Sequence, residues 1–286
     1  MKPLTLAVGA ILLAGLGLVG WKAFRYRKDA QTWHSRWETL HGNPGARDRY
    51  ADDNARLRRA GASPHRVIFL GASITESLDF QQLFPGQNFV NRGIGGQLVW
   101  QQVLRVEPDA LDLNPEAVVI KMCAINLLPD APPLEETQYY FAMLADTIRR
   151  RGVKVIQATA VPVTRAYDRT EGDGHVTERL TRFNAWVRDQ VRAHNDMLLD
   201  YSAALADEEG YLPDSLSDDG LHPNDAGKRR MAAAIRAAIV EGRGQPQGVE
   251  TPPTPTEPTA PAPTEAAPTA PAPTAPGAAP EAPPQR

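Results

Sequence analysis

The sequence has a single cysteine, little excess charge and no metal-binding motif. Cys123 stands alone, which excludes an intrachain disulfide, and its place at the end of an apolar run predicts a small buried residue. A net charge of −3, with acidic and basic residues interspersed, excludes the basic surface of a nucleic-acid-binding protein. The six histidines show no H-E-x-x-H or other zinc spacing. We therefore expect neither a zinc site nor a nucleic-acid partner.

One long apolar run lies near the N-terminal end. Residues 4–21 carry no charged side chain, and four basic residues follow within residues 22–28. Because no small-x-small cleavage site follows the run, an uncleaved membrane anchor is favoured over a secretory signal peptide. The positive charge after the run favours a cytoplasmic domain. The C-terminal tail instead has the composition of a cell-envelope spacer, and we expect a membrane-anchored, extracytoplasmic domain.

Composition divides the chain into four parts. Residues 1–28 form the predicted anchor. Residues 29–62 are polar and helix-friendly, and they predict either a helical stalk or extra helices packed on the domain. Residues 63–242 predict one folded domain. Residues 243–286 are rich in Pro, Ala and Thr and predict a disordered, solvated tail, because such a composition buries no core.

Short apolar runs alternate with helical patterns through the predicted domain. This alternation predicts βαβ units, and therefore an α/β domain with a parallel sheet. The expected strands are Arg66–Gly71, Asn88–Asn91, Ala117–Cys123, Lys154–Ala160 and Met197–Asp200. The expected helices are Ser77–Phe84, Leu98–Val106, Leu134–Arg151, Val176–Asn195 and Asn224–Glu241.

A serine follows the first expected strand. Ser73 stands just after Gly71, at the end of the sheet where open α/β proteins bind ligands. Far downstream, Asp219 and His222 are three residues apart. This spacing lets the carboxylate orient the imidazole while the other ring nitrogen takes a proton from a serine. Taken singly, Ser73 also fits a helix cap, Asp219 a turn and His222 a surface position.

Two further segments follow the second and third expected strands. Residues 91–97, N-R-G-I-G-G-Q, place Gly96 in a loop whose backbone N–H groups can face a ligand, and they do not form a dinucleotide fingerprint. Asn126 follows the third strand, where its amide can donate to an oxyanion. Taken singly, the first segment also fits a tight turn and Asn126 a cap or turn.

Together the four segments resemble the SGNH subgroup of the GDSL-type hydrolase superfamily, over roughly residues 66–241. The residues that match its blocks are Ser73, Gly96, Asn126, Asp219 and His222. The resemblance implies a flavodoxin-like, three-layer α/β/α fold around a mostly parallel, five-stranded sheet. The sequence departs from the family's G-D-S and G-x-N-D blocks at Ala72, Ala124 and Leu127.

The resemblance also implies an activity, the hydrolysis of carboxylic esters. It implies Ser73 as the nucleophile, His222 as the general base and acid, and Asp219 as the group that orients the imidazole. The backbone N–H groups of Ser73 and Gly96 and the Asn126 amide would form the oxyanion hole, with no metal and no cofactor. The expected substrates are small-molecule, carbohydrate or lipid esters with short acyl or acetyl groups. Two alternatives stay open: an O-acyltransferase acting on envelope polysaccharide, and a non-catalytic binding protein of the same fold.

Overall fold

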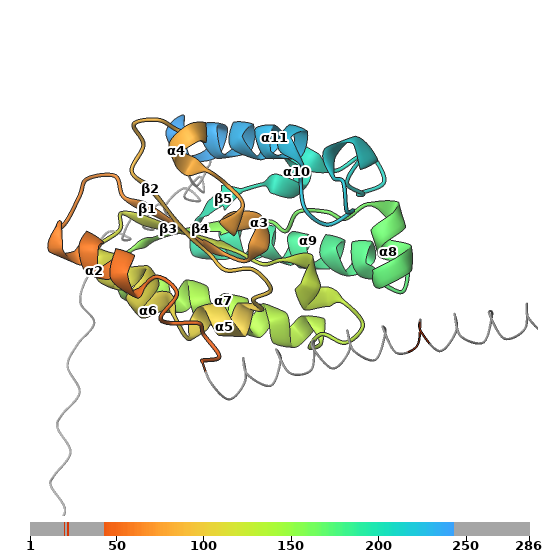
Figure 1. Ribbon diagram of the computed structural model, residues 1–286, viewed down its shortest axis with the longest axis horizontal. Helices are drawn as coiled ribbons and strands as arrows, with labels where there is room; N and C mark the ends of the chain where they lie inside the picture. Colours follow the sequence, from red (N-terminus) through yellow and green to blue (C-terminus); the bar gives the residue numbers. More distant parts are fainter. Residues whose placement is uncertain (1–19, 21, 23–42, 243–286) are drawn as a thin grey trace, which may run out of the picture. The chain divides into compact units, whose positions relative to one another are not determined.

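The computed structural model describes residues 43–242, together with residues 20 and 22 (Figure 1). The predicted membrane anchor, apart from these two residues, lies outside the described part of the chain. So do the predicted tail and the part of the 29–62 segment before residue 43. Within the described residues, no helix is long and apolar enough to cross a membrane.

Five parallel strands form the central sheet, in the order β2-β1-β3-β4-β5. This is the flavodoxin-like order, in which ligands bind at the carboxyl ends of the strands beside the point where the order reverses, here between β1 and β3. The predicted α/β class and its five strands are confirmed, and the sheet is parallel throughout. The strands are β1 (Val67–Gly71), β2 (Phe89–Gly93), β3 (Ala117–Lys121), β4 (Lys154–Ala158) and β5 (Met197–Leu199).

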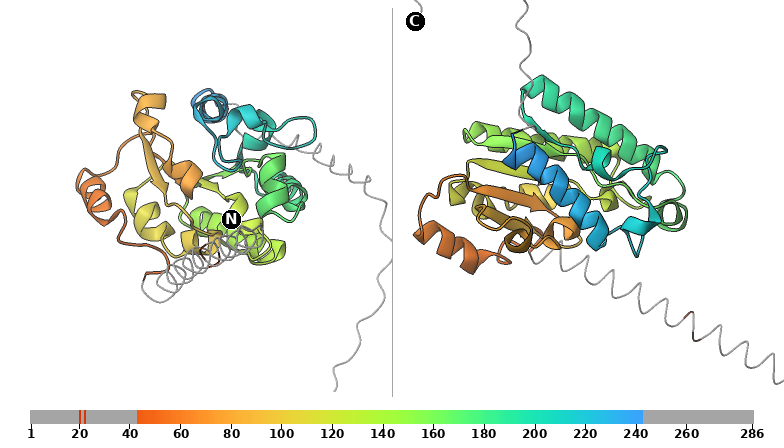
Figure 2. Two further views of the ribbon diagram at one scale, coloured as in Figure 1. Left: turned by 45° about the vertical axis from the view of Figure 1, so that its right-hand side comes forward. Right: turned by 90° about the horizontal axis from the view of Figure 1, so that it is seen from above.

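Helices cover both faces of the sheet, so the fold has the three layers that were predicted (Figures 1 and 2). Alternate residues of β1 enter different apolar clusters: Ile68 and Leu70 face one helical layer, and Val67 and Phe69 face the other. Burial on both faces explains why the strands are continuous apolar runs in the sequence. One layer contains α5 (Val99–Val103), α6 (Val106–Asp109), α7 (Leu134–Arg150) and α9 (Val176–His194). The other contains α3 (Ser73–Glu76), α4 (Phe80–Leu83), α10 (Tyr201–Leu205) and α11 (Asp225–Ile235).

Three predicted helices have different bounds in the structure. The stretch Ser77–Phe84 is not one helix: α3 begins earlier, at Ser73, and α4 begins after Asp79, whose carboxylate accepts the Gln82 N–H at 3.0 Å. Leu98–Val106 divides into α5 and the start of α6. The last predicted helix is α11, which is capped by Asn224 and continues as a π-helix, η4 (Arg236–Val240).

Two of the helices that were missed each follow a side chain that caps the first turn. Thr164 accepts the Tyr167 N–H at 3.2 Å where α8 (Arg165–Glu171) begins. Asp200 accepts the Ala203 N–H at 3.0 Å where α10 begins. Both residue types are strongly preferred as caps, so the signal was present in the sequence.

The residues just before the first strand pack on the domain. Helix α2 (Ala51–Arg59) contacts α6 and the 3₁₀-helix η1 (Leu111–Leu113). Its buried Asn54 donates to the Asp109 carboxylate at 2.7 Å and accepts two hydrogen bonds from Arg92. Since a buried arginine must be satisfied by such partners, α2 is part of the packed structure around the end of β2.

Candidate active site

Ser73 lies at the carboxyl end of β1, on the first residue of α3. The turn between them is tight, because a Cβ added to Gly71 would lie 2.2 Å from Thr75 Oγ1, so only glycine fits. Ala72, where the family pattern has an aspartate, is buried in the apolar cluster between the sheet and α4. The strand and this turn therefore present the Ser73 hydroxyl at the end of the sheet where ligands bind.

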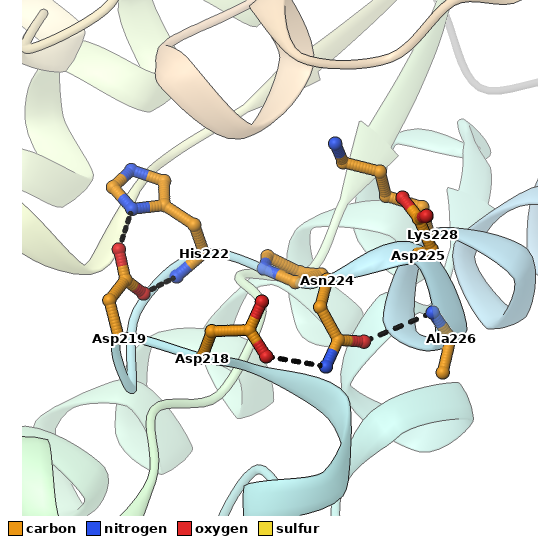
Figure 3. Close-up of a pocket in the computed structure, with 8 residues that line it drawn as sticks. Asp218, Asp219, His222, Asn224, Asp225, Ala226 and Lys228 are labelled. Carbon is orange, nitrogen blue, oxygen red and sulfur yellow. Dashed lines mark hydrogen bonds and ion pairs between the residues drawn. The ribbon is translucent and has the colours of Figure 1, made fainter.

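The structure brings Ser73 and His222 together. Ser73 Oγ lies 2.9 Å from His222 Nε2. His222 Nδ1 lies 2.7 Å from Asp219 Oδ2 (Figure 3). Because a carboxylate accepts the Nδ1 proton, the neutral ring leaves Nε2 free to accept the serine proton. The side chains of His222 and Asp219 are 40% and 56% exposed, so this end of the series is open to solvent.

The Asp219 carboxylate organises the loop that carries the histidine. Its Oδ1 accepts the backbone N–H groups of Leu221 at 2.9 Å and His222 at 2.8 Å. Burial by itself raises the pKa of Asp219, but the hydrogen bonds from the His222 N–H, the His222 ring and the Leu221 N–H outweigh it and hold that pKa well below its usual range. Asp219 is therefore a permanent anion beside the imidazole and stabilises its protonated form.

Sequence reasoning missed the residues that support this loop. Ser217 Oγ donates to the His222 carbonyl at 2.8 Å and accepts the Gly220 N–H at 2.9 Å. Gly220 has a φ of +84°, and a Cβ there would lie 2.6 Å from Thr164 Oγ1 and 2.8 Å from Tyr167 Cβ. The start of α8 therefore packs directly against the loop. Only the glycine between Asp219 and His222 signalled this contact in the sequence.

Asn126 lies in η2 (Ala124–Leu127), just after β3 and therefore beside the end of β1. Its buried side chain accepts the Val99 N–H at 2.9 Å through Oδ1 and donates to the Cys123 carbonyl at 2.9 Å through Nδ2. These two bonds fix the orientation of the amide and leave the second Nδ2 proton available. Ala124 and Leu127, which depart from the family pattern, are both buried.

Gly96 follows β2 in the glycine-rich loop, with a φ of +75°. The loop lies close to Ser73, since a Cβ added to Gly95 would be 3.9 Å from Ser73 Cβ. The Gly95 N–H donates to Glu76 Oε2 at 2.8 Å. Sequence reasoning missed Glu76, because nothing in the neighbouring sequence distinguishes it from an ordinary surface carboxylate.

An open hollow of about 560 Å³ lies next to His222, on the side of α11 (Figure 3). Asn224, which caps α11 and lines the hollow, donates to Asp218 at 3.2 Å. The residues that line it are mostly polar: Asp218, Asp219, His222, Pro223, Asn224, Asp225, Ala226 and Lys228. Among the residues that the structure describes, no group of three His, Cys, Asp or Glu side chains is arranged to hold a metal ion.

A flavodoxin-like sheet with a serine, a histidine and an aspartate joined in series at its carboxyl edge defines the SGNH class of α/β hydrolases. The model of the GDSL-like Lipase/Acylhydrolase family matches residues 69–230, more than half of the chain. The protein therefore belongs to this family and is an ester hydrolase.

Solved structures share the fold. A GDSL-like lipase from Bacteroides thetaiotaomicron is 27% identical with a TM-score of 0.60, over 69% of this chain and 98% of that one. A candidate acylhydrolase from Bacteroides fragilis is 26% identical with a TM-score of 0.61, over 69% and 97% of the two chains. An acetylxylan esterase from Geobacillus stearothermophilus is 19% identical with a TM-score of 0.51, over 62% and 95%. No curated protein sequence matches the chain.

Proposed function

We propose that the protein hydrolyses carboxylic esters with short acyl groups through an acyl-enzyme on Ser73. The observation that carries the proposal is the unbroken series of hydrogen bonds from Ser73 Oγ through the His222 ring to Asp219. A nucleophile within reach of a base, which is itself oriented by a third group, is the arrangement that activates a serine.

Each step follows from this geometry. Ser73 Oγ attacks the ester carbonyl carbon while its proton passes to His222 Nε2, 2.9 Å away. The charged imidazole, stabilised by Asp219, then gives that proton to the alcohol oxygen as the C–O bond breaks. In the second half a water molecule loses a proton to Nε2, attacks the acyl-enzyme and releases the acid, and the proton returns to Ser73 Oγ.

The tetrahedral intermediates need donors for their oxyanion. We assign this role to the backbone N–H groups of Ser73 and Gly96 and to the Asn126 amide. The fixed amide of Asn126 and the closeness of the glycine-rich loop to Ser73 support the assignment. Loss of one such donor costs about 3–4 kcal/mol of transition-state stabilisation.

O-acyl transfer to a carbohydrate hydroxyl is the second candidate. It uses the same acyl-enzyme, and an acceptor hydroxyl takes the place of water. The open, polar hollow beside His222 favours it, because its carboxylate, amide and ammonium groups suit a hydroxyl-rich acceptor. Measuring ester cleavage with and without an added sugar acceptor, and looking for the acylated sugar, separates transfer from hydrolysis.

Labelling with a fluorophosphonate probe tests the nucleophile. We expect the wild-type protein to be labelled at Ser73 and to cleave p-nitrophenyl acetate, and Ser73→Ala to do neither. Ser77→Ala is the matched control, because Ser77 lies just after the same short helix and its hydroxyl donates to the Ile74 carbonyl at 2.9 Å. Cleavage by Ser73→Ala at the wild-type rate would refute the proposal. An unlabelled, folded wild-type protein would favour the non-catalytic binding protein.

A further inference from the structure

The loop that carries Gly96 is held through the neighbours of this glycine. A Cβ added to Gly96 meets no atom of the described chain within 4 Å. On either side, however, the Gly93 carbonyl, the Gly95 N–H and the Gln97 side chain each take part in a hydrogen bond with a residue outside the loop. The position of the Gly96 N–H therefore depends on these three anchor points.

Glu76 supplies the anchor nearest to the nucleophile. It lies on α3, three residues after Ser73, and its Oε2 accepts the Gly95 N–H at 2.8 Å. The two segments are also in close contact, because a Cβ added to Gly93 would lie 2.1 Å from the Glu76 nitrogen. Glu76 thus joins the helix that begins with Ser73 to the residue before Gly96.

Residues 44–50, which precede α2, supply the other anchors. Tyr50 donates its hydroxyl proton to the Gly93 carbonyl, and Arg49 pairs with Glu76 Oε1 at 3.2 Å. Gln97 Nε2 donates to the Gly45 carbonyl at 3.0 Å.

The Gln97 side chain is itself tied back to the sheet. Its Oε1 accepts from the buried Arg105 at 2.7 Å, and Arg105 also donates to the Gly71 carbonyl at 3.0 Å. This carbonyl lies two residues before Ser73. The loop around Gly96 is therefore connected to the nucleophile turn on both sides.

We propose that residues 44–50 and Glu76 form a brace that positions the Gly96 N–H for the oxyanion, with Glu76 as its main positioning residue. The proposal rests on the proposed function, because Gly96 acts as a donor only in that reaction. The exposed pair of Arg49 and Glu76 contributes little stability by itself, since surface ion pairs are typically worth under about 1 kcal/mol. Its effect is geometric, and a misplacement of about 1 Å can cost about 10²-fold in rate.

Three variants of the full chain test the brace, with kcat and KM measured for p-nitrophenyl acetate. Glu76→Ala removes the acceptor of the Gly95 N–H, and we expect kcat to fall about 10-fold or more while KM changes less than about twofold, because the donor acts in the transition state. Glu76→Gln keeps an acceptor oxygen and should restore most of kcat. Glu116→Ala is the control. Glu116 is a similarly exposed carboxylate, and it pairs with Lys154. It lies just before β3 and is therefore at the opposite end of the sheet from Glu76.

Each outcome bears on the brace. A wild-type kcat in Glu76→Ala overturns the brace, and so does a change in KM alone. A Glu76→Gln variant with a kcat as low as that of Glu76→Ala also overturns it. If Glu76→Ala does not fold, Tyr50→Phe tests the brace instead, because it removes only the hydroxyl bound to the Gly93 carbonyl. A severalfold lower kcat in Tyr50→Phe supports the brace, and an unchanged kcat refutes it. If the proposed function is wrong, the fluorophosphonate probe does not label Ser73 in the wild type. If only the brace is wrong, Ser73 is still labelled and Ser73→Ala is still inactive.

Discussion

Replacing Gly220 by alanine should separate the folding of the domain from the alignment of the loop that carries Asp219 and His222. The added Cβ would lie 2.6 Å from Thr164 Oγ1, which is 0.8 Å short of the 3.4 Å at which ordinary contact begins. It would also lie 2.8 Å from Tyr167 Cβ, which cannot turn away because it is fixed to the backbone of α8. The loop between Asp219 and His222 must therefore move.

This displacement should reduce the rate more than it reduces stability. A shift of about 1 Å would break the 2.9 Å contact between Ser73 Oγ and His222 Nε2, and we expect kcat to fall about 10²-fold. The positive φ of residue 220 adds about 1–2 kcal/mol of destabilisation. The assay is kcat for p-nitrophenyl acetate beside urea unfolding of the same preparation.

Gly210→Ala is the matched control for Gly220→Ala. Gly210 has a φ of +87°, close to that of Gly220, but a Cβ there would meet its nearest atoms only at 3.8 and 3.9 Å. It should lose a similar free energy of unfolding and keep the wild-type kcat. Equal losses of kcat in the two variants, or an unchanged kcat in Gly220→Ala, would refute a displacement of the loop that carries His222.

Three other substitutions test the site and the core. Asp219→Asn should lower kcat about 10⁴-fold in ester cleavage, because an amide no longer fixes the His222 tautomer. Circular dichroism should show an unchanged fold. A loss of kcat below tenfold contradicts this role of Asp219. Asn126→Ala should lower kcat about 10²–10³-fold with little change in KM, and an unchanged kcat removes it from the oxyanion hole. Burial lowers the pKa of Lys121, so the unfolded chain binds this proton more readily than the folded chain does, and this residue destabilises the fold most at low pH. Lys121→Met should therefore be more stable than wild type at about pH 6 in urea unfolding, with the gain shrinking toward about pH 10; a gain that grows with pH would contradict the assignment.

The fold could be predicted from the sequence, because parallel strands buried on both faces form continuous apolar runs. Ser73, Asp219 and His222 were accessible for a different reason, since each stands in a short local motif. The start of α3 was missed because four residues are too few to show a helical period, and only the structure places Ser73 on a helix.

The supports of the site were not accessible in the same way. Glu76 contacts Gly95, and Gly220 contacts Thr164. In each pair the two residues lie in loops that follow different strands, so no local spacing in the sequence predicts the contact. The cap at Thr164 was a readable signal for α8, but its role beside Gly220 follows only from tertiary packing.

The distance in sequence between Ser73 and His222 has a consequence for the newly made protein. The two residues are 149 positions apart, so at about 5–20 residues per second the ribosome adds His222 about 7–30 seconds after Ser73. In the proposed reaction Ser73 has no base until then, so we expect a growing chain to have no esterase activity. We therefore expect activity to begin only after the loop that carries His222 and α11 have packed against the rest of the domain.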